Sequence, residues 1–377
     1  MPRPLRPHIA AGRARLACAA ALIVVIGACS TAVSGTGRRA SPRPTARPSA
    51  DPSTSPHPTR STATAAQGEF SFAFAGDVHF EERTADRLAH PATAFGEAKP
   101  VLAAADLTMV NLETAITTRG EPAPKEFHFR APAAAFTALH DAGVDVATMA
   151  NNHAADYGAV GLRDTLAAIR ASRFPVVGIG ANTGEAYAAW QTSVNGVQVA
   201  VIAASQVRDE TLANYTAGPD SPGIASADSD ALLQSVRAAK AAGYVVVVYL
   251  HWGIEYTSCP DADQRGLADA LAHAGAAAII GAHVHQLQGA GWRPDGAFVA
   301  YGLGNYLWWR SFGNAQDDNG VLTLRFRSGR VVAERFAPAH LDDRGVPLPA
   351  TGSEAARIDA EWEQVRQCAN LAAGPPR

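Results

Sequence analysis

The sequence has few cysteines, few charged residues and no long apolar run, and each scarcity excludes a class of protein. Four cysteines in 377 residues are too few for a disulfide-dense miniprotein. The longest apolar run has 13 residues, 16–28, whereas a membrane-spanning helix needs about 20. Hydrophobic residues make up 47% of the chain and charged residues 18%, a composition that excludes a disordered protein. The lack of a long apolar run excludes a polytopic membrane protein. The length suits one large domain or two ordinary ones.

The net charge of −3 conceals two segments of opposite charge. Residues 1–68 hold nine arginines and one acidic residue, a local charge of +8. Residues 69–377 hold 23 basic and 34 acidic residues, a local charge of −11. Nucleic-acid binding requires a basic surface, so we expect no nucleic-acid partner for the acidic segment.

The N-terminal segment predicts export and anchoring. Residues 1–28 have a basic leader and an apolar run of the length found in secretory signals. The run ends in Ile26-Gly27-Ala28-Cys29, which resembles a bacterial lipobox, so we expect lipidation of Cys29 and an extracytoplasmic, membrane-anchored protein. An ordinary cleaved signal and a secreted product are the alternative. Residues 29–68 are rich in Ser, Thr, Pro and Arg, which predicts a disordered linker.

The remaining chain has the pattern of an α/β fold, in which short apolar runs alternate with Ala-rich helical stretches. Strands that are almost continuously apolar indicate a sheet covered on both faces. We assign residues 69–345 to one domain and 346–377 to a C-terminal helix and tail. The expected strands are 70–75, 107–110, 144–150, 197–203, 244–250, 276–280, 298–301, 321–327 and 331–336, and the expected helices 132–142, 159–172, 228–242, 261–274 and 353–367.

Polar side chains follow these strands directly, and ligands in open α/β sheets bind beyond the carboxyl ends of strands. Their oxygens and imidazoles, without a thiolate, suit Mn, Fe or Zn better than Ca. Seven ligands exceed the needs of one tetrahedral zinc, and two metal ions that share a carboxylate would use them for phosphoryl hydrolysis. The seven candidates are Asp77, His79, Glu113, Asn152, His251, His283 and His285.

The order of these motifs resembles that of the CapA family of capsule and poly-γ-glutamate biosynthesis proteins. The resemblance covers roughly residues 70–310 and rests on Gly76-Asp77, Asn111-Leu112-Glu113, Asn151-Asn152-His153, His251-Trp252-Gly253, His283-Val284-His285 and Gly304-Asn305. It implies a four-layer α/β/β/α calcineurin-like metallophosphatase fold. It further implies an anionic extracellular polymer or synthase-complex subunits as partners.

The resemblance also implies a role for each residue. Asp77, His79 and His285 would bind a first divalent metal, Asn152, His251 and His283 a second, and Glu113 would bridge them, where the wider superfamily uses Asp. His153 would be the proton-transferring histidine, and Asp156 would orient it or support its loop. Three other side chains near the motifs are candidates for substrate contact: Arg130, Glu255 and Asn305. The alternative for Glu255 is a surface carboxylate, and that for Asn305 is a tight turn.

Two further questions stay open at this level. Cys259 and Cys368 could pair in an oxidising compartment, because neither belongs to a metal-type cysteine motif. For function, the intact histidines favour a metal-dependent hydrolase acting on a phosphate ester or related bond. A non-catalytic capsule-assembly or polymer-binding lipoprotein that retains the fold is the alternative, and the longer side chain of Glu113 favours it.

Overall fold

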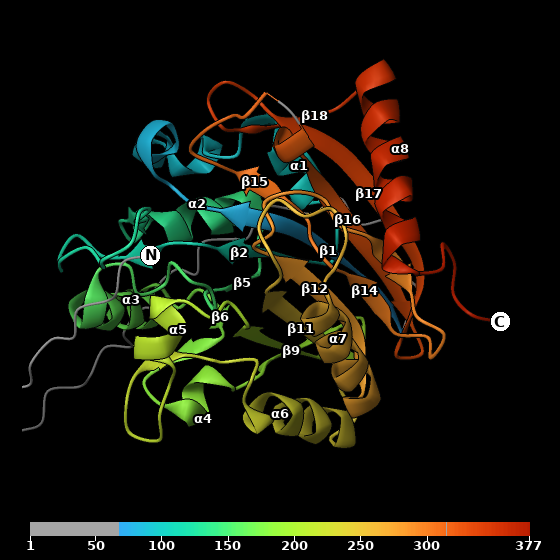
Figure 1. Ribbon diagram of the computed structural model, residues 1–377, viewed down its shortest axis with the longest axis horizontal. Coiled ribbons are helices and arrows are strands. Elements are labelled where there is room, and N and C mark those ends of the chain that lie inside the picture. The colour runs from blue at the N-terminus through green and yellow to red at the C-terminus, as the bar shows by residue number, and fades with distance from the viewer. Residues whose placement is uncertain (1–67, 314) are drawn as a thin grey trace, which may run out of the picture. The chain divides into compact units, whose positions relative to one another are not determined.

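The computed structural model describes residues 68–313 and 315–377 (Figure 1). The predicted signal peptide, the lipidation of Cys29 and nearly all of the predicted linker lie outside these residues. None of the helices within the described residues is long and apolar enough to cross a membrane.

Two large sheets form the centre of the fold. The first has the order β18-β17-β16-β1-β2-β5-β6, with β15 paired to the end of β1. Strands β1, β2, β5, β6 and β15 run parallel, whereas β16, β17 and β18 are antiparallel. The bounds are β1 Glu69–Val78, β2 Leu107–Leu112, β5 Val146–Thr148, β6 Val176–Val177, β15 Asn305–Leu307, β16 Asp318–Arg327, β17 Arg330–Leu341 and β18 Pro347–Pro349.

The second sheet has the order β13-β14-β12-β11-β9-β8. Its four inner strands are parallel, and β8 and β13 pair antiparallel at its edges. The bounds are β8 Trp190–Val194, β9 Val197–Ser205, β11 Val245–His251, β12 Ala276–Ala282, β13 Ala290–Trp292 and β14 Phe298–Ala300. Two short pairs complete the strands: β3 Ala115–Ile116 with β4 Arg130–Ala131, and β7 Ile179–Gly180 with β10 Gly223–Ile224.

Helices cover the outer faces of the sheets. Residues of α2 and α3 pack on the first sheet, and residues of α6 and α7 pack on the second (Figure 1). The α-helices are α1 Lys99–Leu102, α2 Ala134–Ala142, α3 Gly158–Ser172, α4 Thr183–Ala186, α5 Glu210–Tyr215, α6 Asp230–Ala241, α7 Ala262–Ala274 and α8 Gly352–Ala369. The 3-10 helices are Glu82–Ala89, Pro91–Thr93, Gly96–Ala98 and Ala315–Asp317.

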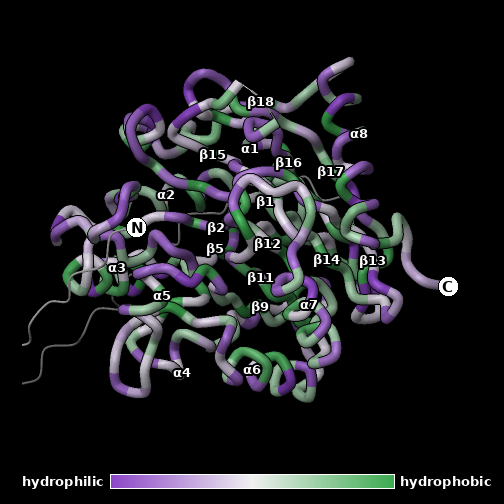
Figure 2. The backbone as a smooth tube through the Cα atoms, viewed as in Figure 1, coloured by the Kyte–Doolittle hydropathy of each residue, from purple (hydrophilic) through white to green (hydrophobic). Residues whose placement is uncertain are grey.

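Successive side chains of the central strands enter different core layers. Phe72 and Phe74 pack between the two sheets, whereas Ala73 and Ala75 pack beneath the helices of the first sheet. β11 does the same, with Val247 between the sheets and Val248 beneath α6 and α7. This alternation needs apolar residues at every position, which explains the green colour of the central strands in Figure 2. The predicted four-layer α/β/β/α fold is thereby confirmed.

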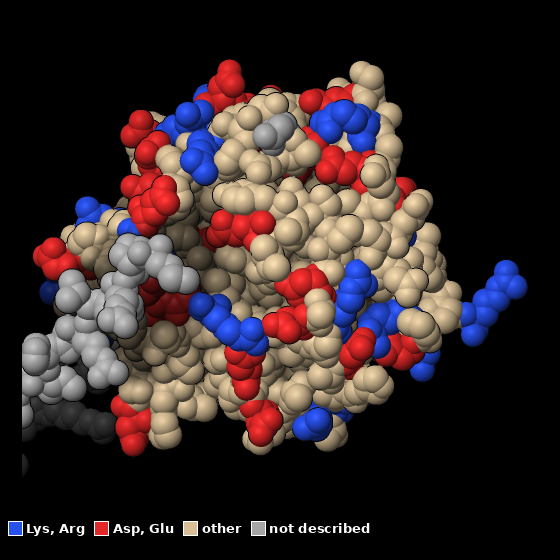
Figure 3. All heavy atoms as spheres, in the orientation of Figure 1, with Lys and Arg blue, Asp and Glu red and all other residues tan. Residues whose placement is uncertain are grey.

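The structure also differs from the sequence-based expectations in detail. The run 298–301 forms a shorter strand, β14, and the strand that precedes it and pairs with it, β13, was not expected. Three 3-10 helices occupy 82–98, where no element was expected, and Pro91 and Gly96 interrupt regular helical bonding there. On the face shown in Figure 3, acidic and basic side chains are interspersed, so neither sign dominates that face.

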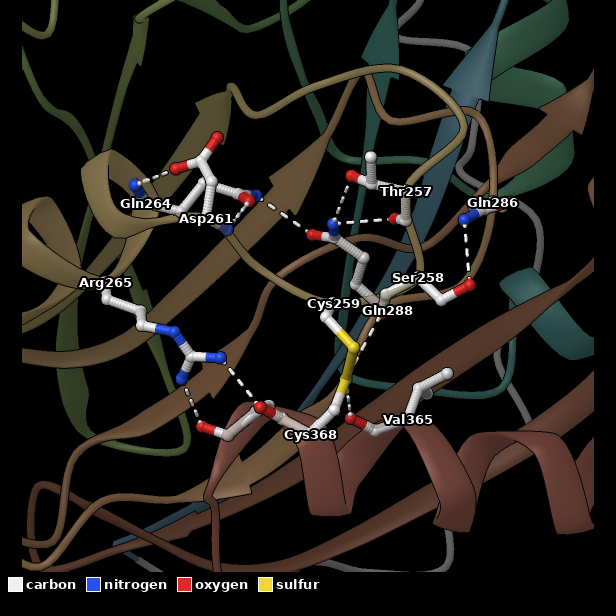
Figure 4. The surroundings of a disulfide bond; sticks show 11 residues. Thr257, Ser258, Cys259, Asp261, Gln264, Arg265, Gln286, Gln288, Val365 and Cys368 are labelled. Carbon is white, nitrogen blue, oxygen red and sulfur yellow. Dashed lines mark hydrogen bonds between the residues drawn. A yellow bond between two sulfur atoms is a disulfide. The ribbon is translucent and has the colours of Figure 1, made fainter.

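The C-terminal helix α8 packs on the first sheet and is linked covalently to the loop between β11 and α7. Trp362 stacks on Phe336 of β17 with ring centroids 4.1 Å apart. Cys368 forms a disulfide with Cys259, which lies in the loop between β11 and α7 (Figure 4). Arg265 of α7 donates hydrogen bonds to the carbonyls of Cys368 and Ala369 at the end of α8.

Removing this disulfide is expected to lower the free energy of unfolding. The bond joins residues 109 positions apart, so it removes much chain entropy from the unfolded state. We expect the Cys259→Ser, Cys368→Ser double variant to lose about 2–5 kcal/mol in denaturant unfolding. Reductant should destabilise the wild type and leave the double variant unchanged; equal stability of both proteins would contradict the prediction.

Candidate metal centre

The carboxyl ends of the parallel strands in both sheets bring seven polar side chains together. Asp77 lies near the end of β1, Glu113 follows β2, and His251 ends β11. The hydroxyl of Tyr249 donates to the carbonyl of Ala75 at 2.7 Å, which joins the two sheets directly below the site. Six of the predicted ligands are buried and Asn152 is half-buried: Asp77, His79, Glu113, His251, His283 and His285 are the buried ones.

Glu113 is the most unusual residue of the site. Its side chain is fully buried, and neither carboxylate oxygen has a hydrogen-bond partner. Burial raises the pKa of Glu113 well above its ordinary value, and the charge of Asp77 adds to the shift. A buried carboxylate without a partner is costly unless a cation joins it. The donor set around Glu113 therefore fits a metal ion.

Two groups of ligand atoms lie close enough to hold a cation. One comprises Glu113, His283 and His285, the other Asp77, Glu113 and His251, and within each group the ligand atoms lie within 4.8 Å of one another. Glu113 belongs to both groups, which is the position of a bridging carboxylate. In these groups Asp77 lies with His251, and His283 lies with His285. Asp77 also lies close to His285, with Oδ2 3.6 Å from His285 Nδ1, as the family-based assignment places them.

His79 lies outside both groups. Its Nε2 accepts the backbone N–H of Trp309 at 3.2 Å, and its Nδ1 is buried without a hydrogen-bond partner. The ring lies 4.2 Å from the rings of both Phe129 and Trp308, measured between centroids. Burial lowers the pKa of His79 well below its ordinary value, which favours the neutral ring. Of the two ring nitrogens, Nδ1 is the one without a hydrogen-bond partner.

Asn111, to which the motif analysis gave no role, orients two of the ligands. Its Nδ2 donates to Asp77 Oδ1 at 2.7 Å and lies 3.1 Å from His251 Nδ1. Its Oδ1 accepts a hydrogen bond from Asn151, which also accepts the backbone N–H of His153. The predicted ligand Asn152 lies beside this network, with Oδ1 2.8 Å from His251 Nε2.

His153, Asp156 and Lys125 form a second set of contacts next to Glu113. His153 Nδ1 lies 2.6 Å from Asp156 Oδ2, and its Nε2 faces Glu113 Oε1 at 3.8 Å. Lys125 Nζ lies 2.5 Å from Asp156 Oδ1 and donates to the carbonyl of Asn152 at 2.6 Å. Burial raises the pKa of Asp156 to about 7, although Lys125 opposes the shift. Burial also lowers the pKa of His153, and Lys125 adds to that effect.

His283 and His285 have backbone conformations that are uncommon for residues with a side chain. Their φ angles are +92° and +56°, in the left-handed region. Such conformations are costly and cluster at functional sites. The turn lets the His283 N–H donate to Asp77 Oδ2 at 3.2 Å and leaves His283 Nδ1 buried without a partner.

His285 carries the opposite pKa shift from the other histidines. Burial acts to lower its pKa, but the hydrogen bond with Asp77 and the charge of Glu113 outweigh burial and raise it to about 9. Burial lowers the pKa of His251 to about 4 and that of His283 well below its ordinary value. The anionic neighbours of His285 therefore distinguish it from His251 and His283, whose pKa values burial lowers.

Two of the three predicted substrate-side residues lie beside His285. Asn305 Oδ1 is 2.9 Å from His285 Nδ1, and the exposed Glu255 Oε1 is 3.9 Å from His285 Nε2. Arg130 instead lies over the ring of Tyr157 at 4.6 Å, and its backbone N–H donates to Glu81. Lys125, which contacts Asp156 and the carbonyl of Asn152, was not a candidate in the sequence analysis.

We expect Asn111→Ala to weaken metal binding without removing a ligand. The variant loses the donor that holds Asp77 and His251, and loss of such supporting contacts costs about 10–100-fold in metal affinity. Competition titration of Mn²⁺ or Zn²⁺ against a chelating dye measures the change. Asn214→Ala, on the exposed face of α5, is the control and should match the wild type. Unaltered affinity in Asn111→Ala would refute this role.

Comparisons with known proteins agree with this arrangement of motifs. The chain matches the family described as "Bacterial capsule synthesis protein PGA_cap" over residues 71–308. It is 30% identical over 275 residues to the "PGA biosynthesis protein CapA" of Bacillus subtilis (strain 168), covering 69% of this chain and 68% of that protein. It is also 30% identical over 312 residues to a "Probable polyglutamine synthesis accessory protein" of Mycobacterium tuberculosis (strain ATCC 25618 / H37Rv), covering 76% and 79%.

Among solved structures, the chain is similar to a novel phosphatase from Mycoplasma pneumoniae, with 14% identity and a TM-score of 0.45, covering 74% of this chain and 95% of the other. The family match and the Bacillus relative settle the classification. The chain belongs to the bacterial capsule synthesis protein family PGA_cap, which includes CapA.

Proposed function

We propose that this protein is an extracytoplasmic, metal-dependent hydrolase that acts in the biosynthesis of a capsule or poly-glutamate polymer. The observation that carries the proposal is the buried carboxylate of Glu113, which has no hydrogen-bond partner, faces His251 Nε2 at 3.4 Å and belongs to both groups of ligand atoms. Burying such a group lowers the stability of the fold, because a neutral side chain would fill the space at lower cost.

Asp77, Glu113, His251, His283 and His285 would hold two divalent cations, such as Mn, Fe or Zn, with Asn152 and His79 beside them. Such a pair of cations activates water and neutralises the charge of a phosphoryl group. His153 would transfer a proton at Nε2, because Asp156 occupies Nδ1 and sets the orientation of the ring. Lys125 would hold Asp156 and the loop of Asn152 in register.

The predicted signal and Cys29 support export and lipid anchoring, and the disulfide suits an oxidising compartment. Membrane lipid and the subunits of a polymer synthase are the partners we propose, since the Bacillus relative is a PGA biosynthesis protein. The second candidate function is non-catalytic polymer assembly. Two observations at His79 favour it: its Nε2 accepts a backbone hydrogen bond, and this histidine lies outside both groups of ligand atoms.

Metal content and turnover test the proposal together. The full-length protein, purified in detergent, should contain about two divalent ions per chain after Mn²⁺ or Zn²⁺ loading, measured by elemental analysis. It should hydrolyse a phosphodiester, and His283→Ala should lose both properties. Metal at trace level in the wild type would overturn the dinuclear site. Bound metal without turnover on phosphate, ester or amide substrates would favour the assembly function.

A further inference from the structure

Outside the ligand set, an arginine surrounded by aromatic rings lies beside the metal centre. The Arg310 guanidinium carbon is 4.6 Å from the ring centroids of Trp309 and Phe312 and 5.5 Å from that of Phe127. Tyr256 is a further neighbour, because its ring is 6.4 Å from Phe312 and its hydroxyl interacts with Arg310. These five residues are called the Arg310 cluster.

The Arg310 cluster adjoins the metal centre on two sides. The backbone N–H of Trp309, the residue before Arg310, donates to His79. The Tyr256 ring lies 5.8 Å from that of His285, and the Tyr256 N–H donates to the carbonyl of Val284 between the two site histidines. A group bound at the Arg310 cluster would therefore be next to a group bound at the metal centre.

Arg310 has no carboxylate within 4.0 Å among the residues that the structure describes, and its Nε is buried without a hydrogen-bond partner. The acids of its own loop are occupied. Asp317 accepts from Ser311 and from the backbone N–H groups of Phe312 and Gly313, and Asp318 pairs with Arg357. These bonds shape the loop and leave the charge of Arg310 unneutralised.

The Arg310 cluster also gathers exposed apolar surface. Three large apolar side chains are exposed in the described part of the chain: Phe127 at 40%, Tyr256 at 44% and Ile254 at 58%. Two of them belong to the Arg310 cluster, and the third lies in the same loop as Tyr256. Grouped exposed apolar residues mark binding surfaces. Rings packed on the guanidinium also leave its in-plane N–H groups for an oxyanion, which they can bind in bidentate fashion.

We propose that the Arg310 cluster is a binding subsite for an oxyanion, a carboxylate or a phosphate, carried on a chain with apolar segments beside the charge. As part of substrate recognition the subsite rests on the proposed function, whereas its affinity for an oxyanion needs no metal. Arg310 selects the charged group, and the rings contact the methylene groups that flank it. The subsite places the adjoining bond of a long anionic substrate over the metal centre.

Calorimetric titration of the full-length protein with a hexaglutamate peptide, in the presence of chelator, tests the subsite. We expect Arg310→Gln to weaken binding about 10–100-fold, because one charge-assisted, bidentate interaction is lost. Arg310→Lys should weaken it less, since the charge remains without the planar fork. The matched control is Arg330→Gln, an equal charge change on the exposed β16–β17 hairpin, which should stay within about twofold of the wild type.

Hexaglutamine and inorganic phosphate complete the experiment. Hexaglutamine should not bind, and Arg310-dependent binding of phosphate in place of hexaglutamate would assign the oxyanion to a phosphate group. Equal losses in Arg310→Gln and Arg330→Gln, or equal affinity for hexaglutamine, would overturn the subsite. Because no metal is present, Arg310-dependent binding would stand even if the metal and turnover assays failed, so the two failures are distinguishable.

Discussion

Replacing Glu113 by glutamine is expected to abolish metal-dependent hydrolysis. The amide keeps the size of the side chain but removes the negative charge that both groups of ligand atoms share. Dinuclear metal chemistry contributes several kcal/mol to the transition state, so we expect a loss of roughly 10³-fold or more in kcat/KM. Phosphodiester hydrolysis with Mn²⁺ or Zn²⁺ measures it.

Thermal unfolding separates this effect from misfolding. Metal should raise the Tm of the wild type, since a ligand that binds only the folded state stabilises it. Glu113→Gln should lose this increase. In chelator, the variant should unfold at the same temperature as the wild type or higher, because a neutral amide of the same size replaces a buried carboxyl group that can ionise. Glu97→Gln, an exposed site with the same chemical change, should behave as the wild type in both assays. If metal raised the Tm of Glu113→Gln as much as that of the wild type, the bridging role of Glu113 would be refuted.

Replacing His153 by alanine is expected to lower kcat by about 10²–10⁴-fold while metal stays bound. His153 belongs to neither group of ligand atoms, yet its Nε2 faces Glu113 Oε1 at 3.8 Å. A proton-transfer role further predicts that the loss depends on the leaving group. Esters of alkyl alcohols, which need a proton on departure, should suffer more than esters of p-nitrophenol.

Two controls make the result specific. His273→Ala removes an exposed histidine from the outer helix α7 and should leave the kcat for both classes of ester unchanged. Asp156→Asn keeps the ring of His153 but alters the partner at Nδ1, so we expect a smaller loss with the same dependence on the leaving group. An equal loss on both classes of ester in His153→Ala would indicate a structural role.

The two predictions also discriminate between the proposed functions. A polymer-assembly protein would lose little of its polymer binding when His153 is replaced, because binding alone requires no proton transfer. It would still respond to Arg310→Gln, since that subsite recognises charge without metal. The two proposed functions thus predict different effects for a substitution of His153 and the same effect for a substitution of Arg310.

Much of the site could be inferred from sequence because the ligands follow strands whose apolar character is strong. Near-continuous apolar runs place Asp77, Glu113 and His251 at the ends of parallel strands, and parallel strands end at one edge. The order of the motifs then supplied the family resemblance. Asn111 was less visible, because an asparagine at the end of a buried strand serves equally as a turn residue or as a partner for a carboxylate.

The sequence by itself determined the α/β class, the edge at which the chemistry lies and the residue types available there. Only the tertiary structure decided which atoms meet: that Glu113 belongs to both ligand groups, that His251 lies near Asp77, and that aromatic rings surround Arg310. The physical reason is that local patterns depend on neighbours along the chain. Distances between residues more than a hundred positions apart depend on how the two sheets pack against each other.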